Sequence, residues 1–600
     1  MPFGAEVRPG GETRFRLWAP AAARVELMLT GAARPMTALE EGWFEHVALA
    51  SAGSRYAFRI DGGLTVPDPA SRSNPDDVHA PCMVVDPHSF AWQDAGWRGR
   101  PWEETVLYEL HIGTFTPQGT FAAAIERLDA LAALGVTAIE LMPVADFPGK
   151  RNWGYDGVLL YAPDRSYGTP DDLKRLVQAA HARGLAVLLD VVYNHFGPEG
   201  NYLHAYAPQF FHSAHATPWG AAIHFDGERS RTVRDFYVHN ALYWIEEFHF
   251  DGLRLDAVHA IRDDSDPDIV TEIATALRDG PGRDRHVHLV LENDGNESRR
   301  LERSACGAPL AATAQWNDDL HHALHVITTG EGDGYYGDYT DAPLAQLGRA
   351  LAEGFIYQGQ SSPFRHGSPR GEPSAHLPPA AFVSFLQNHD QVGNRALGER
   401  LHRFADPQRE RAALACLLLA PQVPMLFMGE EYAASTPFLF FCDFGPELAR
   451  AVRDGRREEF ARFAAFADRE AREAIPDPGA TSTFAASKLR WEERERSPHR
   501  ERLDLVRELI GLRRQHIVPR LAGARASGHP EIVNGVLQVT WTLGDGALLS
   551  LRAHFGTQAA TIPPAPAGET ICQWGVQRAP GGELVFDPGA VHVRLRQSDA

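Results

Sequence analysis

The sequence predicts an α/β protein with a central (β/α)8 barrel, an N-terminal β-sandwich and a C-terminal β-domain. Residues 1–95 and 520–600 carry short runs in which apolar and polar side chains alternate between Gly- and Pro-rich turns, which is typical of antiparallel strands. Between them, over residues 96–515, apolar strand-like runs alternate with helical patterns. Repeated strand–helix units favour a parallel barrel.

The N-terminal part predicts a small β-sandwich. Alternating runs cover residues 13–18, 24–29 and 55–60, with turn residues between them. Packing inside the sandwich explains the aromatic side chains of residues 15–20 better than exposure does.

The middle part predicts the barrel. Pro170 is placed to open a helix, because proline is favoured at the first helical position. We expect the first, second and eighth strands at residues 106–112, 137–142 and 424–430, early helices at 121–134 and 171–183, and a last helix at 503–515.

Two insertions interrupt the regular spacing. Residues 196–232, between the third strand and its helix, are rich in Gly, His, Pro and aromatic residues, and loops of this length are usually functional. Residues 446–475, after the eighth strand, form a charged helical insertion, for which a solvated helical face is the alternative interpretation.

Composition excludes several classes of partner. The net charge of −20 disfavours nucleic acid and anionic membranes. The five cysteines are scattered without metal-type spacing, so we expect reduced thiols. The N-terminus has no apolar signal region and no run is long enough to span a membrane. We expect a cytoplasmic protein without a membrane partner, and a monomer.

Residues 250–259 contain the most informative pattern. Leu253 and Leu255 alternate with Arg254 and Asp256, so the two charged side chains share one face of a strand. A guanidinium beside a carboxylate keeps the carboxylate ionised, and a positioned carboxylate is a candidate nucleophile. A structural ion pair is the alternative.

Three further apolar runs also end in acid, Asn or His side chains. Parallel barrels place catalytic side chains at the C-terminal ends of their strands. These end residues are Asp190, Asn194 and His195 in the first run, Glu292 in the second, and His389 and Asp390 in the third.

In this order the four segments resemble the four sequence regions of the α-amylase superfamily of glycoside hydrolases. The resemblance implies that Asp256 is the nucleophile and Glu292 the general acid/base of a retaining mechanism. It implies that Asp390, beside His389, holds the sugar at the cleavage site. Glu292 follows an apolar run with no adjacent cation, and an apolar setting would keep it protonated.

The resemblance also implies the substrate-binding residues around this pair. His195 would contact the same sugar, and Asp190 would orient Arg254. Tyr155, within residues 153–156, would be the aromatic surface on which the sugar stacks, with core packing as the alternative. Residues 15–20 resemble the sandwich of branching and debranching members, where exposed aromatic residues would bind glucan.

We expect no cofactor and no required metal. Many members of the superfamily use the residue matching Asn194 as a calcium ligand, but residues 196–232 show no calcium-loop pattern. Four histidines in this insertion have no zinc-type spacing and are better explained as lining a pocket. They are His204, His212, His215 and His224.

Narrower segments resemble the members of the superfamily that act on maltooligosyltrehalose. Those enzymes cut the α-1,4 bond next to the terminal trehalose and release it. Glycogen branching enzyme is the alternative, and a non-catalytic glucan-binding protein is an alternative of another class. The segments are residues 314–322, 335–339, 425–432, 437–443, 452–460 and 483–489.

A trehalose leaving group needs contacts beyond Glu292. The loop after the sixth strand offers an indole for stacking and polar groups for sugar hydroxyls, although packing in the barrel wall is an alternative for the indole. The candidates lie on the loops after the fifth and sixth strands and are Asn293, Asp294, Trp316, Asn317, Asp318 and His321.

Overall fold

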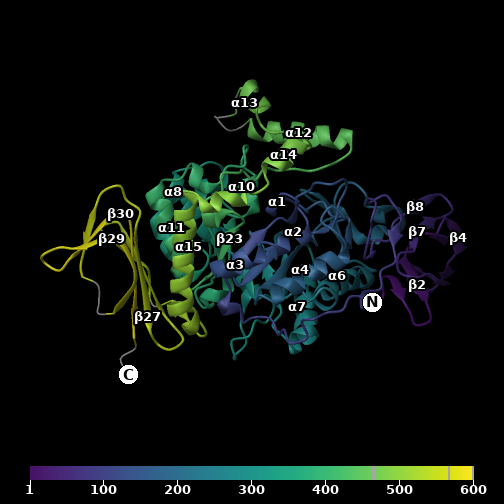
Figure 1. The fold of residues 1–600 in the computed structure, drawn as a ribbon, viewed down its shortest axis with the longest axis horizontal. Coiled ribbons are helices and arrows are strands. Elements are labelled where there is room, and N and C mark those ends of the chain that lie inside the picture. Colours follow the sequence, from purple (N-terminus) through teal and green to yellow (C-terminus); the bar gives the residue numbers. More distant parts are fainter. Residues whose placement is uncertain (462–465, 467, 527, 565–567, 598–600) are drawn as a thin grey trace.

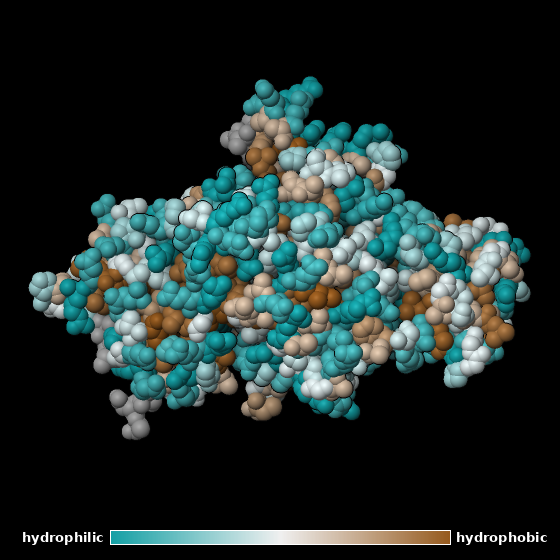
Figure 2. All heavy atoms as spheres, in the orientation of Figure 1, coloured by the Kyte–Doolittle hydropathy of each residue, from teal (hydrophilic) through white to brown (hydrophobic). Residues whose placement is uncertain are grey.

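The computed structural model describes residues 1–461, 466, 468–526, 528–564 and 568–597. The N-terminal sheets lie at one end of an elongated molecule, the barrel lies in the middle, and the C-terminal sheet lies at the other end (Figure 1). Figure 2 shows that hydrophilic residues cover most of the face turned to the viewer. Within the described residues, no helix is long and apolar enough to cross a membrane.

The described residues form a closed barrel of eight parallel strands, which confirms the predicted fold class. The barrel closes where β23 pairs with β10. Both faces of these strands are buried, which explains their continuous apolar runs. In barrel order they are β10 (Leu107–Leu110), β11 (Ala138–Leu141), β14 (Ala186–Val191), β17 (Gly252–Leu255), β18 (His288–Leu291), β19 (Ala314–Trp316), β22 (Phe382–Phe385) and β23 (Val423–Phe427).

Helices surround the barrel, and two of them differ from the prediction. The helix expected at 121–134 is two helices, because the chain leaves regular geometry between Ile125 and Leu128. The last helix begins at His499, earlier than predicted, and ends in a π-helical turn. The main helices are α2 (Phe121–Ile125), α3 (Leu128–Leu134), α4 (Pro170–His181), α6 (Ser230–Glu247), α7 (Ile269–Asp279), α8 (Asp318–Thr329), α9 (Pro343–Glu353), α11 (Pro407–Leu419) and α15 (His499–Leu512).

Shorter helices lie in the connections between these elements. α4 begins at Pro170 as predicted, and Thr169 and Asp172 form a capping box at its first turn. The short helices include α1 (Ile112–Phe115), α5 (Leu203–Tyr206), α10 (His389–Gly393), α13 (Arg469–Glu473), α14 (Thr481–Ala486) and the 3-10 helix η8 (Gly334–Tyr339), whereas α12 (Pro446–Phe460) is longer, with 15 residues.

The N-terminal part consists of two antiparallel sheets, and its aromatic residues are mainly core. Phe15 and Trp18 are buried, as the packing interpretation predicts. Phe3 and Trp18 contact Phe236 and Phe210 of the barrel region. One sheet contains β1 (Gly4–Val7), β2 (Glu12–Trp18), β6 (Trp43–Leu49) and β5 (Thr37–Ala38). The other contains β4 (Ala32–Pro35), β3 (Val25–Leu29), β7 (Arg55–Ile60), β8 (Leu64–Val66) and β9 (Cys82–Met83).

The described C-terminal residues form an antiparallel sheet that packs on the barrel helices. The indole of Trp541 donates a hydrogen bond to the Leu351 carbonyl of α9 at 3.1 Å. The strands are β24 (Arg525–Ala526), β25 (Glu531–Val533), β26 (Val536–Thr542), β27 (Leu548–His554), β28 (Ala560–Ile562), β29 (Glu569–Arg578) and β30 (Leu584–Arg596).

Both predicted insertions contain defined structure. Residues 196–232 contain α5 and the hairpin of β15 (Phe211–Thr217) and β16 (Gly220–Ile223). Within 446–475, α12 and α13 project from the barrel (Figure 1), while residues 462–465 and 467 lie outside the described residues. Two small pairs of strands complete the fold: β12 (Ala145–Asp146) with β13 (Leu159–Pro163), and β20 (Gln360–Ser361) with β21 (Pro369–Arg370).

Candidate active site

Arg254 is the centre of the candidate site. It lies on β17, directly opposite Asp190 of the neighbouring strand β14. One terminal nitrogen of its guanidinium donates to Asp190 at 2.7 Å and to Asp256 at 2.8 Å. The other donates to Glu292 at 3.0 Å. The predicted pairing of Arg254 with Asp256 and Asp190 is therefore present, and one side chain joins carboxylates from three strand ends.

Asp256 has the environment of an ionised carboxylate. Burial raises its pKa, but Arg254, His195 and a hydrogen bond from Asn194 outweigh that effect, and the net pKa is below its ordinary value. The Asn194 amide donates to the Asp256 carboxylate at 3.0 Å. A carboxylate that stays charged while largely buried is ready to act as a nucleophile.

Glu292 has the opposite balance. The expectation that it has no adjacent cation is wrong, because the fold brings Arg254 to it from another strand. The backbone N–H of Ala257 also donates to it at 2.7 Å. Burial nevertheless raises the pKa of Glu292 well above its ordinary value, and the negative charges of Asp256 and Asp318 add to the effect, against Arg254. The expected protonated state therefore rests on burial and neighbouring carboxylates.

His389 and Asp390 begin the short helix α10 beside this pair. His389 is buried, and its Nδ1 contacts Glu109 of β10 at 2.5 Å. Asp390 is exposed to the site, and its carboxylate accepts a hydrogen bond from Asn394 at 2.5 Å. Loss of solvation within the site and the charge of Asp256 raise the pKa of Asp390, while His389 lowers it. The arrangement leaves Asp390 free to meet sugar hydroxyls.

Tyr155 closes the other side of the site. Its hydroxyl donates to Asp190 at 2.6 Å, and its ring stacks on His389 with centroids 5.0 Å apart. The backbone oxygen of Tyr155 contacts Nε2 of His195 at 3.1 Å. The His195 ring in turn stacks on Trp219, which is 48% exposed. The structure thus gathers the predicted sugar-binding residues and adds Trp219.

Sequence reasoning missed two buried carboxyl groups below the site. Glu109 holds His389, and Glu140 of β11 is buried with burial raising its pKa well above the ordinary value. A signal was available, because each is an acidic residue inside an otherwise apolar strand, within residues 106–112 and 137–142. A charge at an inner barrel position indicates a polar network.

Trp316 does not contact the site as a stacking surface. It is 1% exposed, and the Arg254 guanidinium lies over its ring at 4.1 Å from the centroid. Its ring also packs against Phe385. The expected sugar stacking is wrong and the packing alternative is right, because the barrel interior already covers the indole. Trp316 supports Arg254 instead.

Asn317 and His321 also lie behind the site. Asn317 caps the start of α8 and donates to the Gly354 carbonyl at 2.9 Å. His321 is buried, with Nδ1 at 2.8 Å from the Leu386 carbonyl and Nε2 at 3.2 Å from the Tyr336 hydroxyl. Both side chains are occupied within the protein, so the expectation that they contact the sugar is wrong in this structure.

Asp318, in contrast, remains half-buried and lies close enough to Glu292 for its charge to act on that carboxyl group. Burial and the charge of Asp294 raise its pKa to about 7, against a lowering effect of Arg370. Its negative charge is one of the causes that raise the pKa of Glu292. Of the other predicted leaving-group residues, Asp294 also stays accessible, with its side chain 47% exposed, whereas Asn293 is buried.

Two exposed aromatic residues lie on the side of Asp318 and Asp390. Tyr335 is 38% and Phe364 53% exposed, and their ring centroids are 6.0 Å apart. The Tyr335 hydroxyl donates to Gln391 at 3.2 Å, next to Asp390. The aromatic run at 335–339 was visible in the sequence, but nothing local joined Phe364 to it.

Of the four histidines of the first insertion, His212 and His215 lie on β15, His224 directly follows β16, and His204 lies on α5. Ring centroids of His212 lie 4.3 Å from His215 and 4.6 Å from His224. Over the described ranges, no group of three His, Cys, Asp or Glu side chains is placed to hold a metal ion. The expectation of no required metal stays a prediction.

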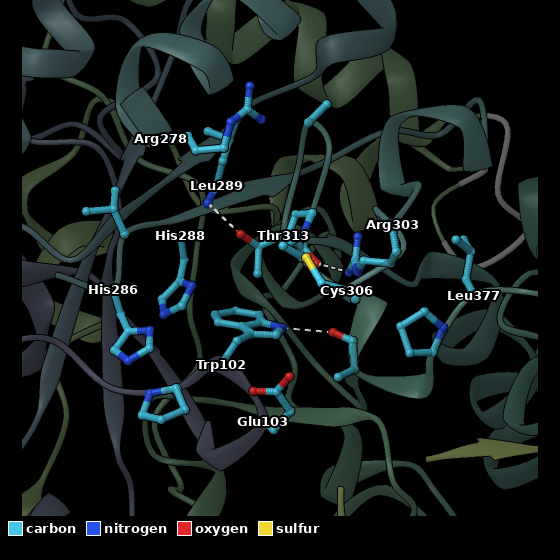
Figure 3. Close-up of a pocket in the computed structure, with 18 of the residues that line it drawn as sticks. Trp102, Glu103, Arg278, His286, His288, Leu289, Arg303, Cys306, Thr313 and Leu377 are labelled. Atoms are coloured by element: carbon cyan, nitrogen blue, oxygen red, sulfur yellow. Dashed lines mark hydrogen bonds between the residues drawn. The ribbon is translucent and has the colours of Figure 1, made fainter. Parts of the chain in front are cut away.

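A large cavity of about 720 Å³ lies away from these carboxylates. Its wall contains Trp102, His288, Arg303 and Leu377 (Figure 3), which precede barrel strands or start them. It is therefore at the N-terminal end of the barrel, whereas the polar side chains of the candidate site lie at the C-terminal end.

Comparison with known proteins identifies the family. The chain is 43% identical over 576 residues to malto-oligosyltrehalose trehalohydrolase of Deinococcus radiodurans, covering 96% of this chain and 89% of that protein. It is 42% identical to the enzyme of the same name from Arthrobacter ramosus, covering 97% and 99%. This chain belongs to the malto-oligosyltrehalose trehalohydrolase family.

Family profiles and a solved structure agree with this membership of the trehalohydrolase family. The alpha amylase catalytic domain profile matches residues 67–242, the carbohydrate-binding module 48 (isoamylase N-terminal domain) profile matches 2–71, and the domain of unknown function DUF3459 matches 528–594. A crystal structure titled putative alpha amylase from Salmonella typhimurium has a TM-score of 0.93 and 47% identity, covering 99% of both chains.

Proposed function

We propose that this trehalohydrolase-family chain hydrolyses the α-1,4 bond that joins the terminal trehalose of maltooligosyltrehalose to the glucan. The observation that carries the proposal is the bridge of Arg254 between Asp256 and Glu292, with opposite pKa shifts on the two carboxyl groups. Two carboxyl groups with separated pKa values are the requirement of glycoside hydrolysis.

In the first step the Asp256 carboxylate attacks C1 of the sugar at the cleavage site. Glu292 gives its proton to the glycosidic oxygen as the bond to that oxygen breaks, so trehalose leaves as a neutral molecule. Both carboxyl groups contact the guanidinium of Arg254, which keeps them close, and a retaining mechanism needs the two groups near one another.

In the second step water hydrolyses the glycosyl ester of Asp256. Glu292, now ionised, takes a proton from the water as its oxygen attacks C1, and the Asp256 carboxylate leaves. Arg254 stabilises the carboxylate that is charged in each step. Both displacements invert the configuration at C1, so the net result is retention of configuration.

The leaving-group side is suited to a disaccharide. Asp318 offers a carboxylate beside Glu292, and Tyr335 and Phe364 offer exposed rings. A non-reducing disaccharide can stack its sugar faces on aromatic rings and can form hydrogen bonds through its hydroxyl groups. A site that pairs polar groups with substrate hydroxyls discriminates against ligands that leave them unpaired.

The test compares maltotriosyltrehalose with maltopentaose, which has the same number of glucose units. We expect trehalose as product, a much higher kcat/KM for the first substrate, and the α-anomer as the first new reducing end by NMR. Equal kcat/KM values would indicate a general α-glucan hydrolase, and branched product without hydrolysis would indicate a branching enzyme. An initial β-anomer would exclude the double displacement.

A further inference from the structure

Arg370 lies below the leaving-group side and joins several loops there. It ends β21 and is 5% exposed. Its Nη1 donates to the Tyr339 hydroxyl at 2.6 Å and pairs with Asp319 at 3.0 Å. Its Nε donates to the Asp294 backbone carbonyl at 2.9 Å, and Nη2 pairs with the Asp294 carboxylate at 3.1 Å. The guanidinium therefore bridges the loop after β18, the start of α8 and η8.

Asp319, the partner of Arg370, is itself a buried junction. Its carboxylate accepts hydrogen bonds from the Tyr339 hydroxyl at 2.5 Å and from the Asn296 amide at 2.9 Å. The backbone N–H groups of Ile356 and Tyr357 donate to it at 2.7 and 3.0 Å. So many donors fix one carboxylate rigidly, and with it the position of the next residue back, which is Asp318.

The β20–β21 hairpin is fastened to the same network. Phe364 and Arg365 lie between its two strands, and Phe364 is 53% exposed. Arg365 donates to the Asp294 carbonyl at 2.9 Å and also pairs with the Asp294 carboxylate. Asp294 comes two residues after Glu292. Arg370 at the base and Arg365 in the loop thus tie the hairpin to the strand end that carries the acid.

We propose that Arg370 is a positioning residue for trehalose recognition, an inference that rests on the proposed function. It holds the hairpin with Phe364 and the start of α8 with Asp318 at fixed places relative to Glu292. A trehalose unit would need contacts with both the hairpin and the start of α8. In a maltose chain the second leaving-group glucose points in another direction, because its linkage differs. Small displacements of binding groups cost rate when geometry is tightly specified.

The guanidinium geometry itself is required. Arg370 serves partners in several directions with a planar fork, whereas lysine offers a single point charge. We would therefore compare Arg370→Lys and Arg370→Gln with wild type on maltotriosyltrehalose and maltopentaose. We expect KM for maltotriosyltrehalose to rise and the ratio of the two kcat/KM values to narrow by about tenfold or more, with kcat on maltopentaose nearly unchanged and no rescue by lysine.

A matched control is Arg72→Gln. Arg72 is also a largely buried arginine paired with a carboxylate, Glu247, at 2.9 Å, but it lies at the junction of the sandwich and α6. We expect this variant to lower the melting temperature without changing the substrate ratio. If Arg370→Lys and Arg370→Gln lowered kcat/KM for the two substrates by the same factor, Arg370 would be merely structural and the proposal would be overturned.

A milder variant covers the case in which Arg370 variants do not fold. Tyr339→Phe removes one hydroxyl that contacts both Arg370 and Asp319. We expect this variant to stay folded and to narrow the ratio of kcat/KM for maltotriosyltrehalose to kcat/KM for maltopentaose several-fold. An unchanged ratio would overturn the proposal. Failure of the proposed function is recognised separately, because wild type itself would then show no preference for maltotriosyltrehalose.

Discussion

A single guanidinium acts on two carboxyl groups with opposite outcomes. Arg254 lowers the pKa of both Asp256 and Glu292. Asp256 also receives the amide of Asn194 and the charge of His195, which together overcome its burial. Glu292 instead faces two further negative charges. The two environments therefore separate the pKa values of the proposed nucleophile and the proposed acid, although both carboxyl groups contact the same guanidinium.

Removing either carboxyl group should abolish the reaction without unfolding the protein. We expect Asp256→Ala and Glu292→Gln to lower trehalose release by several orders of magnitude, because each step needs both groups. Thermal unfolding is the control for folding. A variant that kept more than about a tenth of the wild-type rate, a loss below about 1.4 kcal/mol in barrier, would remove that residue from the assigned role.

The pH profile should depend on Asp318. Activity needs an ionised Asp256, whose pKa is lowered, so the acid limb of the pH–rate profile lies at low pH. It also needs a protonated Glu292, whose pKa is raised, so the basic limb lies at high pH. Asp318, with a pKa of about 7, is charged on the basic side and raises the pKa of Glu292. We therefore expect Asp318→Asn to move the basic limb of kcat/KM to lower pH; an unmoved limb would contradict this coupling.

Local pattern predicted some contacts of the site and missed others for a physical reason. Arg254 and Asp256 are two residues apart on a strand, so their pairing follows from strand geometry. The contact of Arg254 with Glu292 spans 38 residues and depends on barrel closure. The contact of Trp316 with Arg254 could not be predicted from local pattern either, because the direction of the ring depends on how the barrel closes.

At the scale of elements, the sequence pattern located the barrel strands well. It predicted the boundaries of the helices less well. The apolar pattern of 121–134 is continuous, yet α2 and α3 are separate, because periodicity does not report a local break of the backbone. Similarly, the composition of 196–232 indicated a functional loop but not the β15–β16 hairpin, whose pairing register came only with the structure.

The β15–β16 hairpin should contribute to sugar binding through Trp219. This residue follows β15, is 48% exposed and stacks on His195, which lies beside Asp256. We expect Trp219→Ala to raise KM for maltotriosyltrehalose about tenfold with a smaller loss of kcat, since stacking contributes binding more than chemistry. Trp219→Phe is the matched control and should retain most of the affinity. Unchanged KM in Trp219→Ala would place the indole outside the substrate path.

At the scale of the whole molecule, the N-terminal sandwich is joined to the barrel by a shared apolar interface. Phe3 contacts Phe236 of α6 with ring centroids 5.3 Å apart, and Trp18 contacts Phe210 at 5.6 Å. Arg72 pairs with Glu247 at the end of α6. In this protein, Phe3 and Trp18 pack between the sandwich and the barrel region. They are therefore not available to bind glucan.

Deletion of residues 1–95 should therefore destabilise the barrel. Phe210 and Phe236, now buried, would be exposed, and Glu247 would lose its arginine. Burying a large aromatic side chain contributes about 3 kcal/mol each, so we expect residues 96–600 to be aggregation-prone or to melt at clearly lower temperature. The control is Leu49→Ser, at a 75% exposed position of the sandwich, which should leave the melting temperature and activity unchanged. A truncated protein with wild-type melting temperature and turnover on maltotriosyltrehalose would show instead that the sandwich is an independent module.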